Sequence, residues 1–197
     1  MNDKEIQALQ EQVALSDDQQ AFKILFKHYY TTLFQFAVSI VKVREVAEEI
    51  VEDVFIKVWD KRRNLTEIAN LRLYLYVAVK HHCLNHVTRR GNTTELDPDQ
   101  LDVVCAELVP NPEDLLVASE LLQRVNRSIH ELPPKCRIVY KLVKENGLSY
   151  KEAGEILNIS PRTVENHIAA AIKKIASVLE TDFPLPRKSF TLPGVKH

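Results

Sequence analysis

A segment of 27 residues divides this chain into two parts. Residues 91–117 contain seven acidic side chains, three prolines and no lysine or arginine. Proline removes a backbone donor and restricts the residue before it, so a continuous helix cannot cross this segment. The sequence on both sides has the apolar spacing of amphipathic helices. We therefore expect two small helical domains joined by an acidic, flexible linker.

Apolar residues recur at three- and four-residue steps in both flanking parts, without an alternating strand pattern or an internal repeat. The pattern predicts an all-α fold with a bundle of three or four helices before the linker. Helices are expected over about 19–43, 46–63, 70–89, 121–132, 138–143, 150–157 and 161–179, with a loop at 64–70. The expected division is an N-terminal extension (1–20), a first domain (21–90), the linker (91–117), a second domain (118–180) and an irregular tail (181–197).

Composition excludes several classes of protein. No apolar stretch approaches the roughly 20 residues that cross a bilayer, and the polar N-terminus does not resemble a signal peptide. We therefore expect no membrane insertion and a cytoplasmic location. Three widely spaced cysteines indicate reduced thiols, neither a disulfide framework nor a zinc site, and no cofactor is expected.

The formal net charge of -1 conceals a regional pattern. Residues 22–90 carry a net charge of +5, residues 118–180 a net charge of +3, and the linker a net charge of -7. Two basic modules thus flank an acidic connector. The average charge does not exclude nucleic acid as a partner.

The second basic module contains two helix starts with recognisable caps. Ser149 precedes Glu152 by three residues, which is a capping box, and Ser160 precedes Pro161, which suits a first helical position. A short helix, a tight turn at 158–160 and a longer helix predict a helix-turn-helix, whose second helix enters the DNA major groove. Ala153 would lie at the helix crossing. The expected shared core is Ile156, Ile159, Val164, Ile168 and Ile172.

One face of the longer helix is predicted to meet DNA near its N-terminus. Arginine can pair with guanine, asparagine with adenine and glutamate with cytosine, whereas a threonine near the helix start suits phosphate. The alternative is an ordinary solvated surface; the capped turn favours DNA reading. The candidate residues are Arg162, Thr163, Glu165, Asn166, His167, Ala170 and Lys173.

The helix expected at 46–63 combines acidic residues with large aromatic ones. Such a face suits a protein partner better than DNA. Spacing alone instead favours core aromatics beside a solvated acidic face. The candidate residues for a protein contact are Glu49, Glu52, Asp53, Phe55 and Trp59.

The helix expected at 70–89 interleaves basic groups with aromatic ones, which suits a single-stranded nucleic acid. His82 and His86 lie four residues apart, but neither a carboxylate nor a cysteine completes a metal-binding set nearby, so no zinc site is expected. The candidate residues here and in the preceding loop are Asn64, Asn70, Tyr76, Lys80, His81, Asn85 and Arg89.

These motifs together resemble the extracytoplasmic function (ECF) group of sigma factors, which retain regions 2 and 4 of the sigma-70 family. The run AEEIVEDVFIKVW at 47–59 resembles region 2.2, and YLYVAVKH at 74–81 resembles the Trp-Leu-Tyr-x-Ile-Ala-x-Asn segment of regions 2.3 and 2.4. LPPKCR at 132–137, GLSYKEA at 147–153 and SPRTVENH at 160–167 resemble region 4, in wording common in Bacteroidetes. The sequence departs from the family pattern at Glu52, usually Gln, at His81, usually Asn, and at Asn158, often Gly.

The resemblance implies a non-enzymatic factor that gives core RNA polymerase its promoter specificity. Region 2.2 would bind the clamp helices of the beta-prime subunit, which reverses the preference from spacing alone. The loop at 64–70 would trap an extruded base of the minus-10 element, and the helix at 70–89 would hold the melted strand. Region 4 would read the minus-35 element beside the beta flap. An anti-sigma protein is a possible partner, and the chain would be monomeric when free or bound to it.

Two other classes of protein share features with this sequence. The sequence TVENH at 163–167 also resembles LuxR-type regulators, but these carry a domain of strands and helices that the N-terminal half does not suggest. A helical adaptor or anti-sigma-like protein would leave the face from Arg162 to Lys173 unused. An enzyme is disfavoured because no nucleophile elbow, phosphate loop or metal cluster is present in the sequence.

Overall fold

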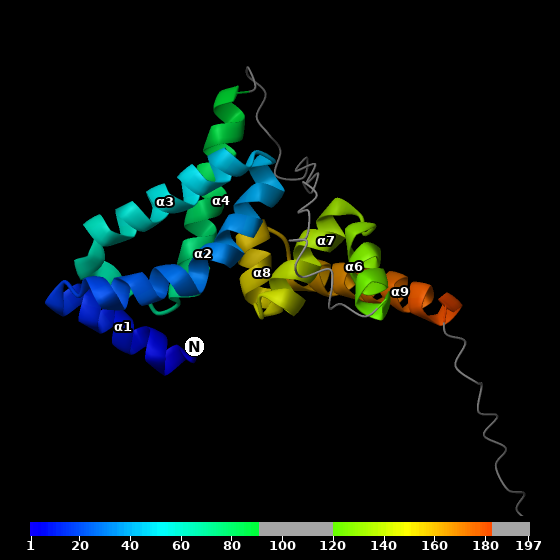
Figure 1. Cartoon of the computed structure of the whole chain (residues 1–197), viewed down its shortest axis with the longest axis horizontal. Coiled ribbons are helices and arrows are strands. Elements are labelled where there is room, and N and C mark those ends of the chain that lie inside the picture. The colour runs from blue at the N-terminus through cyan, green and yellow to red at the C-terminus, as the bar shows by residue number, and fades with distance from the viewer. Residues whose placement is uncertain (91–119, 183–197) are drawn as a thin grey trace, which may run out of the picture.

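The computed structural model describes residues 1–90 and 120–182, and these form helices with no strand among them. Figure 1 shows the helices as two groups, one on each side of the expected linker in the sequence. The all-α fold predicted from the sequence is confirmed. The linker, and the expected tail beyond residue 182, lie outside the described residues.

The first group consists of α1 (Asp3–Ser16), α2 (Gln19–Val41), α3 (Arg44–Asp60), the 3-10 helix η1 (Arg62–Glu67) and α4 (Leu71–Arg90). Helix α2 packs against α1, α3 and α4. Its apolar stripe places Leu25, Leu33 and Ala37 in the core, each at most 2% exposed. The Asp18 side chain caps α2 by accepting from the backbone N–H groups of Gln20 and Ala21.

Residues 1–20, expected as an N-terminal extension, contain helix α1, which packs on the first domain. Asn2 and Glu5 form a capping box at its start, and Val13 and Ala14 are buried. The helix packs on both α2 and η1. Residues 1–16 are therefore an integral part of the first group.

The helix expected at 46–63 divides into α3 and η1, so the expected loop at 64–70 begins inside a 3-10 turn. Arg62 fixes this turn. Its guanidinium lies 4.8 Å from the centre of the Trp59 ring and pairs with Asp17 at the end of α1. The N–H of Ile68 closes the turn by donating to the carbonyl of Leu65.

The second group consists of α6 (Glu120–His130), α7 (Pro134–Tyr140), a π-helical turn (Lys141–Glu145), α8 (Tyr150–Leu157) and α9 (Pro161–Asp182). Ser149 and Glu152 form the predicted capping box, and α8 begins and ends at the predicted residues. Asn158 adopts the left-handed conformation, with φ of 57°, that ends α8 and allows the tight turn. The helix-turn-helix is therefore confirmed as a structural unit.

The core of this unit is confirmed at three of the five expected positions. Ile156, Val164 and Ile168 are at most 3% exposed. Ile159 is half-buried, whereas Ile172 is 47% exposed; its neighbour Ala171 is buried, in a second cluster with Ile129 and Leu132. Seven residues complete almost two turns of helix, so residue 171 lies over Val164 and residue 172 does not.

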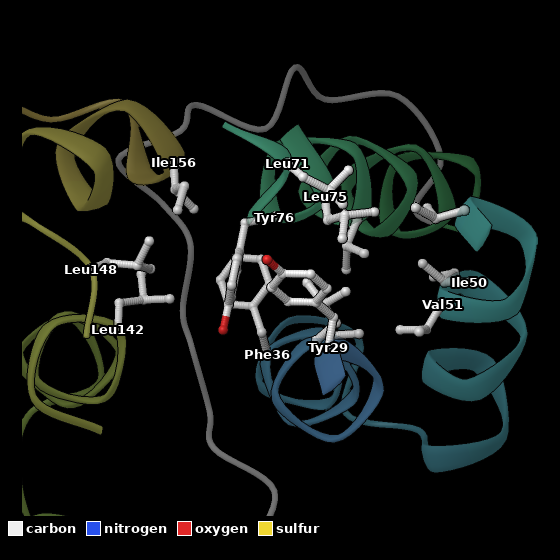
Figure 2. Packing of buried hydrophobic residues seen from close by; sticks show 14 of the residues in the cluster. Tyr29, Phe36, Ile50, Val51, Leu71, Leu75, Tyr76, Leu142, Leu148 and Ile156 are labelled. Atoms are coloured by element: carbon white, nitrogen blue, oxygen red, sulfur yellow. The ribbon is translucent and has the colours of Figure 1, made fainter. Parts of the chain in front are cut away.

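A continuous apolar cluster joins the two groups of helices. Figure 2 shows Leu142, Leu148 and Ile156 of the second group facing Phe36 and Tyr76 of the first. Each of these five side chains is at most 4% exposed. Helices α4 and α8 are in direct contact. The two domains are thus packed against one another in this structure.

Candidate nucleic-acid and polymerase interfaces

The start of α9 presents an exposed polar face. Arg162, Glu165 and Asn166 are all exposed, and so are Ala170 and Lys173 one and two turns further along. Ser160 caps the helix by accepting from the backbone N–H of Thr163. Five of the seven side chains predicted to meet DNA are thus open to solvent on a rigid helix.

Thr163 and His167 lie differently from the other members of this set. The Thr163 hydroxyl is 2.8 Å from that of Ser160. His167 is half-buried, and its Nδ1 lies 3.2 Å from the Cys136 sulfur of α7. Burial, with the nearby charge of Lys135, lowers the pKa of His167. His167 therefore joins α9 to α7 and is not a freely projecting side chain.

Helix α3 exposes its acidic residues. Glu49, Glu52 and Asp53 are all exposed. Phe55 is only 3% exposed, because its ring packs edge-on against Phe26 with the ring centres 4.8 Å apart. Phe55 is therefore a core residue, and the expectation that it lies on a protein-binding surface is corrected.

Trp59 is half-buried at the end of the same helix. The centre of its ring lies 5.0 Å from that of Phe22, and the Arg62 guanidinium lies over the same ring. The acidic face of α3 thus ends at a partly exposed aromatic side chain. Such a combination suits a protein partner.

A cavity of about 470 Å³ lies between α1, α2 and the segment that joins η1 to α4. Asn70, Arg72, Tyr29 and Gln10 line it, together with Glu152 from the second domain. Burial raises the pKa of Tyr29 to about 12, so its hydroxyl is neutral. The volume falls in the range of small-molecule sites. Asn70 thus lies at a cavity, whereas the exposed Asn64 is not part of its lining.

The two domains meet at this cavity through polar contacts. The Asn70 amide donates to the Glu152 carboxylate at 2.6 Å, and Arg72 lies 3.5 Å from the same oxygen. Arg72 also donates to the backbone carbonyl of Gly147 at 3.3 Å. Burial opposes the charge on Glu152, but hydrogen bonds from Ser149 and Asn70 with the charge of Arg72 lower its pKa overall.

Tyr76 is 1% exposed, which corrects the expectation that its ring is available to stack on a base. Its hydroxyl accepts a 2.8 Å hydrogen bond from the Asn146 amide, and its ring packs edge-on against Phe36. The exposed aromatic residue of α4 is Tyr74, at 42%. Tyr76 is covered by Phe36 of its own domain and by residues of the second domain.

The rest of α4 presents the predicted basic and polar groups. His81, Asn85 and Arg89 are exposed at four-residue steps and so share one face of the helix. Lys80 is half-buried, and burial lowers its pKa. His82 lies 2.9 Å from Lys57 of α3, and no cluster of potential metal ligands occurs among the residues described.

Sequence reasoning missed Gln10, Tyr29 and Arg72. A signal for Gln10 exists, because it interrupts the apolar face formed by Leu9, Val13 and Ala14. A polar residue on the buried face of a helix needs a hydrogen-bond partner. Arg72 and Tyr29 had no comparable signal in the spacing of the sequence.

Two families match the chain. A model of sigma-70 region 2 matches residues 25–93, and a model of sigma-70 region 4 matches residues 122–175. The chain is 27% identical over 178 residues to the ECF RNA polymerase sigma-E factor of Escherichia coli K12, covering 87% of this chain and 91% of that protein. It is 24% identical over 183 residues to the RNA polymerase sigma-H factor of Pseudomonas aeruginosa, with the same coverage.

Solved structures of similar fold cover most of the chain. CnrH in complex with the cytosolic domain of CnrY is matched with a TM-score of 0.54 and 22% identity, over 91% of this chain and 99% of that one. The sigma factor RpoE of Bartonella quintana, in complex with the anti-sigma factor NepR, is matched with a TM-score of 0.54 and 20% identity, over 82% and 98%. No helix in the described ranges is long and apolar enough to span a membrane. With regions 2 and 4 both matched in order, the chain belongs to the ECF sigma factors, non-enzymatic members of the sigma-70 family that direct the initiation of transcription.

Proposed function

We propose that three surfaces of this chain bind the promoter and the polymerase. The start of α9 reads the duplex of the minus-35 element, the acidic face of α3 binds the clamp helices of the beta-prime subunit, and the cavity with α4 takes the melted minus-10 strand. The observation that carries the proposal is the exposed start of α9, where Arg162, Glu165 and Asn166 stand on a capped helix-turn-helix.

The chemistry of the α9 face supports direct reading of bases. Arg162 matches guanine O6 and N7, Asn166 matches adenine N6 and N7, and Glu165 accepts from the cytosine amino group. Thr163 and the helix N-terminus are suited to phosphate, and Lys173 adds a positive charge further along. His167 acts in this proposal by holding α9 against α7, while the small Ala170 lets the backbone approach the DNA.

The cavity and the basic face of α4 support capture of a single strand. Extruding one base from a duplex costs a few kcal/mol, which contacts in a pocket and stacking can offset. Asn70 at the cavity and the exposed Asn64 in η1 offer hydrogen bonds, and the exposed Tyr74 offers a ring. His81, Asn85, Arg89 and the partly buried Lys80 line the path along α4. A strand that binds Asn70 has to replace Glu152 there.

The acidic face of α3 supports docking on the polymerase. Glu49, Glu52 and Asp53 offer carboxylates to a basic partner, and Trp59 offers aromatic surface at their edge. The domains proposed for these roles are residues 1–90 and 118–180, with the acidic linker between them. Neither DNA contact has to be tight alone, because tethering two modules raises the effective concentration of the second.

The partners we propose are core RNA polymerase, promoter DNA and an anti-sigma protein, with the beta flap contacting the second domain. Both solved structures of similar fold are complexes: CnrH with the cytosolic domain of CnrY, and the Bartonella quintana protein with an anti-sigma factor. These likenesses support a partner that holds the free chain. The free chain would be monomeric.

Run-off transcription tests the proposal. The purified chain is mixed with bacterial core RNA polymerase, association is measured by gel filtration, and transcription is measured on a library of randomised templates. We expect a stable complex that enriches templates with two short elements separated by a fixed spacing. A chain that binds the polymerase without selecting sequences would contradict the DNA roles, and a chain that does not bind it would contradict the proposal as a whole.

A further inference from the structure

Gln10 is the one buried polar side chain of α1, at 5% exposure. Its Nε2 group donates to two backbone carbonyls, that of Leu65 at 2.9 Å and that of Ile68 at 3.0 Å. An amide nitrogen has two hydrogens, so both donors are used in this pair of contacts. The two carbonyls belong to the segment 65–70, which runs from the last turn of η1 to Asn70.

Apart from the apolar packing of Leu65 and Ile68, few side chains of this segment are buried. Leu65 is buried, but Thr66, Glu67 and Ala69 are exposed between the two helices. The Leu65 carbonyl also accepts from the N–H of Ile68, which closes the 3-10 turn. Gln10 therefore ties both ends of a four-residue turn to α1, and the turn forms one wall of the cavity.

We propose that Gln10 is a positioning residue that sets the shape of the pocket for the extruded minus-10 base, so that α1 takes part in promoter selectivity. This inference rests on the proposed role of the cavity. Gln10 does not itself have to contact DNA. It fixes the wall from Leu65 to Ile68, and through this wall the position of Asn70 at the cavity edge.

The arrangement requires a donor at this position. Glutamate has the same shape but presents oxygen to both carbonyls, which are acceptors, so repulsion replaces attraction. Methionine keeps the length and the apolar packing but donates to neither carbonyl. Both substitutions leave buried carbonyl groups without this partner, which favours another conformation of the turn.

The test compares Gln10→Met and Gln10→Glu with wild-type protein, each in complex with bacterial core RNA polymerase. Gln12→Met is the matched control, because Gln12 is exposed on the same helix. Transcription from the randomised minus-10 library gives the preferred base at each position. The extruded position is identified by the fluorescence of 2-aminopurine placed in the non-template strand. The measured quantity is the ratio of transcription from the preferred base to transcription from the others.

We expect this ratio to fall about tenfold at the extruded position in both Gln10 variants, equivalent to about 1.4 kcal/mol. Selectivity at the minus-35 element should be unchanged. Gln12→Met keeps the wild-type ratio at every position. Because a ratio is unaffected by the fraction of folded protein, a partly unfolded variant still gives a valid result.

Wild-type selectivity in both Gln10 variants would overturn the inference while leaving the proposed function intact. Variants that cannot fold at all would also overturn it, since Gln10 would then serve the whole domain. Absence of base selectivity in the wild-type complex would instead count against the proposed role of the cavity itself.

Discussion

The Asn70 amide donates a 2.6 Å hydrogen bond to the Glu152 carboxylate, across the boundary between the two domains. Glu152 is also the N3 residue of the capping box that starts α8, where it accepts from the Ser149 N–H. One carboxylate thus caps the first helix of the helix-turn-helix and holds the first domain. This group and Arg72 beside it add polar contacts to the apolar packing between the domains.

Replacing Arg72 with alanine is expected to loosen the domain packing. The change removes the ion pair to Glu152 and the contacts with the Asn146 and Gly147 carbonyls. The pair is about one third exposed on the arginine side, so we expect a loss of roughly 1 kcal/mol or less in the closed state. Energy transfer between dyes on the two domains would report an increased mean separation.

The matched control for this experiment is Arg63→Ala. Arg63 is 75% exposed and lies near Asp17 within the first domain, so its loss should leave the separation unchanged. An Arg72→Ala chain with the wild-type separation would show that the apolar cluster at Tyr76 holds the domains together without the polar contacts.

Replacing Gly154 with alanine is expected to destabilise the helix-turn-helix. An added Cβ would lie 2.7 Å from the Ile159 carbonyl oxygen, a backbone atom that cannot swing away. Overpacking of this kind costs about 1–3 kcal/mol, and the better helix propensity of alanine returns only about 1 kcal/mol. Thermal unfolding should show a lower Tm for Gly154→Ala than for Glu155→Ala, a change at an exposed neighbour. Equal Tm values would contradict the close approach of the turn to α8.

The sequence predicted helix ends best where side chains mark them. Helix α8 was expected at its observed limits because Ser149 and Glu152 cap its start and Asn158 tolerates the left-handed end. Helix α1 was missed because its polar residues outnumber its apolar ones, although Leu9 and Val13 follow the helical spacing. Local chemistry thus predicts boundaries, whereas docking of a weakly amphipathic helix depends on the rest of the fold.

Burial of particular side chains was harder to predict than the helices. Tyr76 was expected on the surface because periodicity within α4 does not reveal that the second domain covers it. Phe55 lies under Phe22 and Phe26 because α2 and α3 cross there. Such contacts join residues far apart in the sequence. The exposed face of α9 was predictable because it depends on one helix and its cap.

Reversing charge on α3 is expected to weaken docking on the polymerase. Asp53→Lys replaces an exposed carboxylate in the proposed surface with a cation, and a close like-charge contact costs several kcal/mol when desolvated. Affinity for core RNA polymerase, measured by fluorescence anisotropy, should fall at least tenfold while thermal stability is unchanged. Asp60→Lys makes the same change outside the proposed surface and should have little effect. Equal losses in both variants would point to overall charge instead of a defined face.

Replacing Arg162 or Asn166 with alanine is expected to relax selectivity at individual minus-35 positions. Loss of a bidentate base contact costs about 1–3 kcal/mol of discrimination. Duplexes enriched by the wild-type complex, and single-base variants of them, would be compared in binding assays. Lys151→Ala, which removes an exposed cation from α8, should weaken all duplexes alike if it weakens any. Uniform loss in the Arg162 and Asn166 variants would place these residues at phosphates instead of bases.

His167 is expected to make the stability of the second domain depend on pH. Burial and then the charge of Lys135 lower the pKa of His167 in the folded chain below its ordinary value of 6.5. The unfolded chain therefore binds a proton at a higher pH than the folded chain, so stability is full above pH 6.5 and falls as the pH drops below it. Protonation also places a charge on the ring that contacts the Cys136 sulfur. Since His28 and His82 in the first domain shift in the same direction, the decisive comparison is between wild-type protein and His167→Gln. Unfolding of the second domain would be followed by the fluorescence of a dye placed on α9. Between pH 7 and pH 5, the second domain should lose less stability in the variant than in the wild type. Parallel curves of stability against pH would exclude His167 as the source.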